Sequence, residues 1–508
     1  MRTHALTDQF TITQLVRCAT AVLLSVAVGM ATEANAQHQT PSFTPLSPAS
    51  ELPYRVEVRE YQYSGGTLPT LHSYARAEYD GKWLLIAGRT NGVHGFENPG
   101  FDNFPAESQN KDVWVIDPAT GQSWSRALDD GASGLNEAEA LSLSPTNNQF
   151  YQSGDRLYMT GGYGFNGAGG LGTHDALTAI DVPEMMDWVV NGAGTAKDAL
   201  RQIHDDLFKV TGGAMYEVDG RTHIVFGQDF DGVYSPFSNG AYTRQVRSFD
   251  IVDDGTSLSV ENISSTSPTF AYRRRDLNVF PTVSDNGGSL ENGLTALSGV
   301  FTVTNGVWTV PVEIAADGTP SMGDPNAAET FKQGFNQYHS AKLGLFSETT
   351  GSMHEVLFGG ISVMYVDQSS GTPLQDNNVP FVNDITSVVV DYDGNYSQHH
   401  LGFFPELTDA TGALLRFGAN AEFFTDAGIE TYGNGVIKLD AITGETRLGY
   451  IFGGLMTNGP HTQQGADSAA SNRIFEVVLL PVPEPSSIVL AAAGATASLA
   501  AACRRRRT

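Results

Sequence analysis

The chain has 508 residues, a formal net charge of −27 and 41% hydrophobic residues. This apolar content is sufficient for a large core and excludes a wholly disordered chain. Because 29 Lys and Arg residues stand against 56 Asp and Glu, the chain lacks the basic surface that binds nucleic acid.

The N-terminus has the pattern of an export signal. Arg2 and Arg17 precede an apolar run at residues 19–30, and Ala34-Asn35-Ala36 follows it. A basic start, a short apolar centre and an A-x-A site are typical of a secretory signal peptide. A buried N-terminal helix is the alternative, although no cap or amphipathic period supports it. We expect signal peptidase to remove residues 1–36.

The C-terminus carries a second pattern. It consists of Val482, Pro483, Glu484 and Pro485, an apolar stretch at residues 488–502, and then Arg504, Arg505, Arg506 and Arg507. The apolar stretch is just long enough to cross a bilayer, and the arginines would hold that end in the cytoplasm. This order resembles the PEP-CTERM sorting signal of Gram-negative bacteria. The resemblance implies that an exosortase in the inner membrane recognises the Val-Pro-Glu-Pro element and processes residues 482–508; a plain membrane anchor is the alternative.

Together these signals predict transient anchoring in the inner membrane and delivery to the cell surface or the exterior. Without the two ends, which hold six arginines and three acidic residues, the charge becomes about −30. Both cysteines, Cys18 and Cys503, also lie in the ends. The predicted domain, residues 37–481, therefore has no disulfide, although its compartment would permit one.

The domain contains an internal repeat of apolar runs that end in glycine. Six copies occur, at residues 83–88, 157–162, 222–227, 294–299, 355–360 and 448–454. Each copy is followed by a second strand-like run, such as residues 112–117, and preceded by a shorter one, such as residues 73–79 or 207–216. About four strands per unit make one propeller blade.

The pattern of apolar run, Gly-Gly, strand, Asp and Trp resembles the kelch repeat, most fully at residues 83–124 and 157–188. It weakens where Arg89 follows Gly88 and where Ser298 precedes Gly299. The glycines are about 73 residues apart, against about 50 in kelch units, so we expect long insertions. The resemblance implies an all-β fold, a six-bladed kelch-like β-propeller.

Two segments lie outside the repeat. The alternating run at about residues 54–63 has no blade of its own, so we expect it to complete the last blade and close the ring. Residues 182–190 and 196–208 have helical spacing, with Pro183 near the start and Ile203 and Leu207 on one face. They predict two short helices inserted between blades two and three.

Long insertions follow the glycine pairs and should crowd one face of the ring, where binding residues concentrate. On this face we single out Asp229, Asp231 and Tyr234, with Tyr242 and Arg244 nearby. Clustered carboxylates can hold Ca²⁺, but an ordinary Asp-Gly turn is the stronger interpretation. Residues 391–395 also begin like a calcium loop, although a hairpin turn explains them better. No other cofactor is expected.

Arg273, Arg274 and Arg275 form a basic cluster in an acidic domain. Alternate arginines of this extended segment could point into the channel, where a guanidinium suits the carboxylate of an acidic sugar. Structural ion pairs are the simpler alternative. His174 lies on the same face as His94, His339 and His461, but their spacing predicts no metal site.

We therefore expect an exported propeller that binds carbohydrate, such as an exopolysaccharide, or a surface protein through its loop-rich face. An enzyme acting on acidic sugars, of the epimerase or lyase type, is the first alternative, and a structural matrix component is the second. Catalysis is the weaker expectation, since no Gly-x-Ser-x-Gly turn occurs. Kelch-like copper radical oxidases need a Tyr–Cys crosslink, and residues 37–481 hold no cysteine.

Overall fold

The structure is a computed structural model that describes residues 43–95, 103–166, 170–235, 240–304, 306–462 and 465–482. The predicted signal peptide and nearly all of the predicted sorting signal lie outside these ranges. Within them, no helix is long and apolar enough to cross a membrane.

The described chain forms six antiparallel sheets, each built around four strands. In the first three the strands are β2 (Ala75–Tyr79), β3 (Lys82–Ile86), β4 (Asp112–Asp117) and β5 (Gln122–Ala127); β6 (Gln149–Ser153), β7 (Arg156–Thr160), β10 (Ala176–Asp181) and β11 (Leu200–His204); and β12 (Ala214–Val218), β13 (Arg221–Val225), β16 (Val246–Asp253) and β17 (Leu258–Ser265). In the last three they are β18 (Asn278–Asp285), β19 (Leu290–Leu297), β20 (Val312–Ala315) and β21 (Pro320–Ser321); β22 (Ala341–Ser347), β23 (Ser352–Phe358), β26 (Asp384–Val390) and β27 (Tyr396–Phe403); and β28 (Ala421–Thr425), β30 (Thr446–Gly453), β33 (Ile474–Pro481) and β1 (Tyr54–Tyr61).

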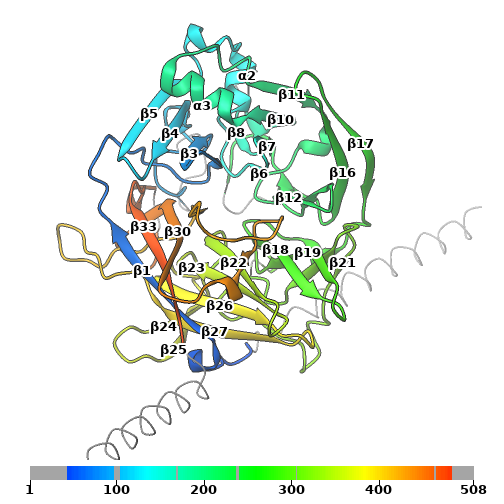
Figure 1. The fold of residues 1–508 in the computed structure, drawn as a ribbon, viewed down its shortest axis with the longest axis vertical. Helices are drawn as coiled ribbons and strands as arrows, with labels where there is room; N and C mark the ends of the chain where they lie inside the picture. The colour runs from blue at the N-terminus through cyan, green and yellow to red at the C-terminus, as the bar shows by residue number, and fades with distance from the viewer. Residues whose placement is uncertain are drawn as a thin grey trace, which may run out of the picture.

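The sheets follow one another around a ring, with their first strands nearest the centre (Figure 1). The molecule is a six-bladed β-propeller, as the repeat predicts. Buried apolar residues between neighbouring blades form the core, and the largest cluster joins the last two blades to β1.

Strand β1 closes the ring, also as predicted. It pairs antiparallel with β33 over its whole length, from Tyr54 opposite Pro481 to Tyr61 opposite Ile474. Val56 and Val58 face the core, and the Tyr54 hydroxyl lies 3.2 Å from both His354 Nδ1 and Ser387 Oγ of the neighbouring blade. The N-terminal strand β1 thus supplies the fourth strand of the last blade, next to the C-terminal strand β33.

The glycine-ended turns have the same backbone geometry in every blade. Two successive residues after the second strand have positive φ: Ala87-Gly88, Gly161-Gly162, Phe226-Gly227, Ser298-Gly299, Gly359-Gly360 and Gly453-Gly454. The second residue of each pair is glycine, so Gly88 aligns with Gly162. The irregularity predicted at Arg89 is therefore wrong. A Cβ on Gly161 would clash with the carbonyl oxygen of Val210, which confirms that close backbone approach requires glycine there.

The predicted helical insertion is only partly correct. Helix α3 (Val182–Asn191) begins at the Asp181 cap and ends at Gly192, but it connects β10 to β11 inside the second blade. Residues 196–208 are not helical: β11 pairs with β10, and a 3₁₀ turn, Asp206–Phe208, follows. A further helix, α2 (Glu137–Ser142), has a capping box between Asn136 and Glu139 and was not predicted.

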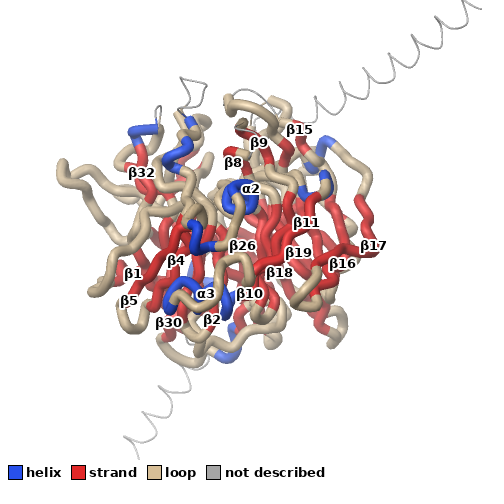
Figure 2. Tube along the Cα trace, turned by 90° about the horizontal axis from the view of Figure 1, so that it is seen from above, coloured by secondary structure: helices blue, strands red, loops and turns tan. Residues whose placement is uncertain are grey.

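The two faces of the ring differ as expected. The connections after the glycine turns contain small hairpins that gather on one face, the loop-rich face, at the top of Figure 2. These are β8 (Tyr163–Phe165) with β9 (Leu171–Thr173), β14 (Gln228–Asp229) with β15 (Ala241–Tyr242), β24 (Met364–Val366) with β25 (Pro373–Gln375), and β31 (Leu455–Thr457) with β32 (Ser468–Ala470).

We call the opposite face the hairpin face, because the turns that join the first and second strands of each blade lie there. It carries mostly short turns. One exception is the α3 connection of the second blade. The other is the connection between β28 and β30, which leaves the last blade, adds β29 (Ile437–Lys438) in parallel to β22, and reaches the fourth blade. We call residues 431–437 of this connection the strap. Asn434 of the strap donates to the carbonyl of Thr282, at 3.0 Å.

Candidate functional site

A belt of six residues surrounds the channel one or two positions before the first strand of each blade. All six have φ between 48° and 66°: Ser73, Asn147, Gly212, Asp276, His339 and Asn420. Five of them are non-glycine residues in the left-handed region, which such residues rarely adopt. Because residues in sparsely populated conformations cluster at functional sites, the belt marks the channel as a candidate functional site.

Backbone hydrogen bonds link the belt residues of adjacent blades. The N–H of Ser73 donates to Asn420 at 3.1 Å, and the N–H groups of Asn147, Gly212 and Asp276 each donate to the preceding belt residue, at 3.3, 3.1 and 2.7 Å. Asn420 donates to His339 at 2.6 Å. These bonds fix the belt backbone, so the side chains at the channel have well-defined positions.

The belt side chains bring ionisable groups together. Asp276 Oδ1 lies 3.5 Å from Asn147 Nδ2 and 4.0 Å from His339 Nδ1. Burial lowers the pKa of His339, although the charge of Asp276 opposes this. His339 is therefore neutral at neutral pH and can accept a proton.

The three arginines of the basic cluster alternate in direction. The guanidinium carbons of Arg273 and Arg275 lie over the ring of Tyr242, at 4.0 and 5.7 Å, whereas that of Arg274 lies over Trp308, at 4.7 Å. Arg274 is fully buried and donates to the carbonyls of Ala271 and Ser298, both at 3.3 Å. It is thus a packing residue.

Arg273 also has structural contacts, because it donates to the carbonyls of Phe301 and Thr302. Arg275 differs. It is 4% exposed, and its Nε and Nη1 have no hydrogen-bond partner among the described residues. Its nearest carboxylate is Asp276, with Oδ2 3.5 Å from Nε. Two of the three predicted arginines are therefore held by the fold, and one keeps open donors.

Tyr234 lies beside Arg275, a neighbour that the sequence analysis did not assign to it. Burial raises the pKa of Tyr234, and the neighbouring charge of Arg275 opposes that rise. The Tyr234 hydroxyl lies 3.2 Å from His94 Nε2. Burial lowers the pKa of His94 to about 4, so this imidazole is neutral at neutral pH.

The other predicted site residues lie farther from this group. Lys209 Nζ is 3.7 Å from both Asp229 Oδ2 and Asp231 Oδ1, so these carboxylates already share a cation. Among the described residues no three His, Cys, Asp or Glu side chains form a metal-binding group. Calcium binding at this turn stays a prediction.

Arg244 stacks on Phe270, with its guanidinium carbon 4.7 Å from the ring. His174 is buried, and burial lowers its pKa. Within the described part of the chain, neither side chain makes a hydrogen bond, ion pair or ring contact with Arg275 or Tyr234. Asp391 closes the turn between β26 and β27 by accepting from the N–H groups of Asp393 and Asn395, which confirms the predicted hairpin turn.

Sequence reasoning did not single out the belt residues Ser73, Asn147 and Asn420, or Tyr338, whose pKa burial raises and whose neighbours include Asp276 and Arg275. A signal for the belt is present in the repeat, because each member occupies the equivalent position before a first strand. The residue types differ from blade to blade, so only alignment of the repeat units would have found it.

Residues 481–507 match the PEP-CTERM protein-sorting motif. The chain is thus a six-bladed β-propeller with a PEP-CTERM signal, which indicates processing by an exosortase and export through the inner membrane to the surface of a Gram-negative bacterium.

Among curated proteins there is no match. One solved structure, "Structure of YjhT", is 10% identical to this chain, and the alignment covers 82% of this chain and 96% of that one, with a TM-score of 0.38. So low a score supports no inference about this protein.

Proposed function

We propose that the exported propeller binds an acidic carbohydrate at the channel mouth on its loop-rich face. The observation that carries this proposal is Arg275, which is almost fully buried but has hydrogen-bond donors without partners. A planar guanidinium with open donors suits a carboxylate, which can accept two parallel hydrogen bonds. A buried polar group without a partner costs free energy, and a bound anion would remove that cost.

The surroundings of Arg275 support a sugar ligand. The rings of Phe301 and Tyr242 lie 5.3 and 5.7 Å from its guanidinium carbon, and the Tyr234 hydroxyl is adjacent. Small-molecule sites combine such aromatic surfaces with a few placed polar groups. Asp276 balances the charge of Arg275 without a hydrogen bond and leaves its donors available.

Calorimetric titration of the purified protein with glucuronate, and with glucose as the neutral match, tests this proposal. We expect glucuronate to bind more tightly than glucose, and Arg275→Gln to weaken glucuronate about tenfold or more at this site. Arg244→Gln, on the same face, is the matched control and should bind as the wild type does. If Arg275→Gln keeps the wild-type melting temperature and binds glucuronate at this site unchanged, the proposal fails.

The alternative of an enzyme acting on acidic sugars has one observation in its favour. The Tyr234–His94 hydrogen bond places one neutral imidazole near Arg275, and the Asp276–His339 pair places another beside Asp276; such groups can act as general bases. Incubation with the same sugar acids, followed by NMR, distinguishes the two functions. Turnover that Tyr234→Phe abolishes would establish catalysis, whereas binding without turnover supports the binding protein.

A further inference from the structure

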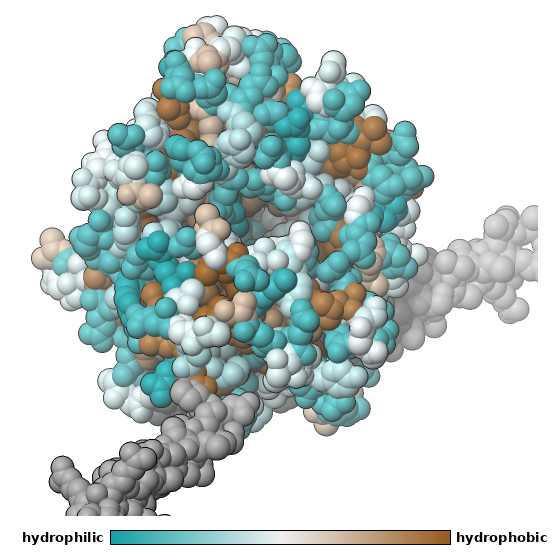
Figure 3. Space-filling model, in the orientation of Figure 1, coloured by the Kyte–Doolittle hydropathy of each residue, from teal (hydrophilic) through white to brown (hydrophobic). Residues whose placement is uncertain are grey.

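A cavity occupies the channel towards the hairpin face, and the belt residues Ser73, Asn147 and His339 are part of its lining. Its volume is about 700 Å³, within the range of small-molecule sites. The first strands of all six blades line it, and the strap forms one wall. Figure 3 shows the hollow at the centre of the ring. None of the loop-face residues Tyr234, Arg273, Arg274 and Arg275 is part of its lining.

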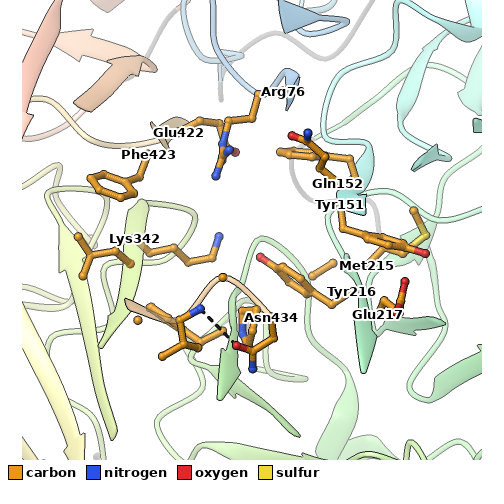
Figure 4. Close-up of a pocket in the computed structure, with 18 of the residues that line it drawn as sticks. Arg76, Tyr151, Gln152, Met215, Tyr216, Glu217, Lys342, Glu422, Phe423 and Asn434 are labelled. Carbon is orange, nitrogen blue, oxygen red and sulfur yellow. Dashed lines mark hydrogen bonds and ion pairs between the residues drawn. The ribbon is translucent and has the colours of Figure 1, made fainter. Parts of the chain in front are cut away.

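Three polar side chains converge in this cavity from different blades. Figure 4 shows Arg76 entering from one wall, while Lys342 and Tyr216 point towards each other across the space. Arg76 forms ion pairs with two glutamates: its Nη1 lies 2.9 Å from Glu78 Oε1, and its Nε lies 3.7 Å from Glu422 Oε2. Its position in the cavity wall is therefore fixed.

Lys342 and Tyr216 have no such partners. Within the described ranges, the Lys342 ammonium makes no hydrogen bond or ion pair, and the Tyr216 hydroxyl makes no hydrogen bond. Two other polar groups of the wall are occupied, because Tyr151 bonds to Thr222 and Asn434 anchors the strap. The cavity thus presents the ammonium of Lys342 and the hydroxyl of Tyr216 towards the same space.

The wall carries two cations, Arg76 and Lys342, and four carboxyl groups, Glu78, Glu217, Asp219 and Glu422, so an anion is favoured only close to Lys342. Burial raises the pKa of Glu422, while the charges of Lys342 and Arg76 oppose that rise. In a concave site with low-dielectric walls the field of a cation is focused on the enclosed space. A ligand anion there would meet Lys342 directly and the side of Arg76 that the glutamates leave open.

We propose that this cavity binds a small organic carboxylate of the size of a sugar acid. Its carboxylate lies between Lys342 and Arg76, and the Tyr216 hydroxyl contacts a ligand oxygen on the opposite side. The site includes the belt residue His339 but neither Arg275 nor Tyr234, so it does not rest on the function proposed for Arg275. The protein would then hold acidic ligands at both ends of one channel.

Titration of the purified protein with glucuronate, and in a separate arm with inorganic phosphate, tests the site. We expect Lys342→Met and Tyr216→Phe each to weaken glucuronate binding at this site, Lys342→Met about tenfold or more. Lys111→Met, on the outer surface in a pair with Asp129, is the matched control and should change nothing. Melting temperatures establish that each variant is folded. If Lys342→Met does not fold, Lys342→Gln takes its place.

The outcomes separate the two sites. If both exist, the wild type binds two glucuronates, and Lys342→Met and Arg275→Gln each remove a different one. If only Lys342→Met abolishes binding, the cavity stands and the function proposed for the loop-rich face fails. Folded Lys342 variants that bind glucuronate with wild-type affinity and stoichiometry would overturn the cavity site, as would binding of phosphate alone.

Discussion

At the residue scale, Glu355 of β23 is an exception to the rule that charged groups stay near water. It is fully buried, and neither carboxyl oxygen has a hydrogen-bond partner among the described residues. Burial raises its pKa from 4.5 to about 8, with a further contribution from Glu313. The folded protein therefore holds this carboxyl group as the neutral acid around neutral pH.

This predicts a loss of stability as pH rises. Between about pH 4.5 and about pH 8 the folded state binds a proton that the unfolded chain has released, so the free energy of unfolding falls with increasing pH. Glu355→Gln removes the titration and should be more stable than the wild type at about pH 8, by on the order of 2–4 kcal/mol. Denaturant unfolding at about pH 5 and about pH 8 measures the difference. The exposed Glu51→Gln is the control, and an equal gap between Glu355→Gln and wild type at both pH values would refute the prediction.

The arginine cluster illustrates what can be read from sequence at this scale. Alternation along an extended segment predicts that Arg273 and Arg275 share a side that Arg274 does not, and their contacts confirm it. Which of the two has open donors depends on carbonyls from residues 301 and 302, about 28 positions away in the chain. Such long-range partners leave no local pattern.

At the element scale, the closing strand could be predicted from the sequence. The run at about residues 54–63 alternates cleanly but belongs to no blade, and the last blade lacks a fourth strand of its own. The segment at residues 196–208 could not be predicted, since the four-residue spacing of Ile203 and Leu207 is compatible with a helix or with a strand followed by a turn. Pairing of β11 with the edge of β10 decided in favour of the strand. Sheet completion therefore agrees with the local spacing in the closing strand and outweighs it in residues 196–208.

Val56→Asp tests the contribution of β1. Val56 is 5% exposed and packs in the largest core cluster, so a buried carboxylate there should destabilise the ring by about 3 kcal/mol or more. Arg55→Asp, on the exposed side of the same strand, is the matched control and should have a much smaller effect. Thermal unfolding compares the two, and equal melting temperatures would mean that closure by β1 does not stabilise the ring.

At the scale of the whole molecule, the absence of cysteine between residues 37 and 481 has a direct test. No disulfide can connect the blades, so stability rests on packing and strand pairing. We expect the unfolding transition of the exported protein to be the same with and without a thiol reductant. A lower melting temperature in reductant would contradict this.

The sorting motif makes a second prediction at this scale. Replacing Pro483 and Pro485 with alanine should leave export intact but prevent processing, so the protein accumulates in the inner membrane with its tail attached. Ser486→Ala is the control that should be processed normally. Membrane fractionation with intact-mass measurement reports both properties, and normal processing of the double alanine variant would contradict the prediction.

The join between ring and tail also has a mechanical consequence. β33 ends at Pro481, where the motif begins, and it lies between β1 and β30 with antiparallel pairing on both sides. A force applied along the strand from a membrane-held tail would shear both ladders, which load their hydrogen bonds together instead of one after another. The N–H of Val482 also bonds to the carbonyl of Pro53, at 2.8 Å, just before β1 begins. The strand that joins the two ends of the chain is therefore also the one that would bear the load while the tail remains in the membrane.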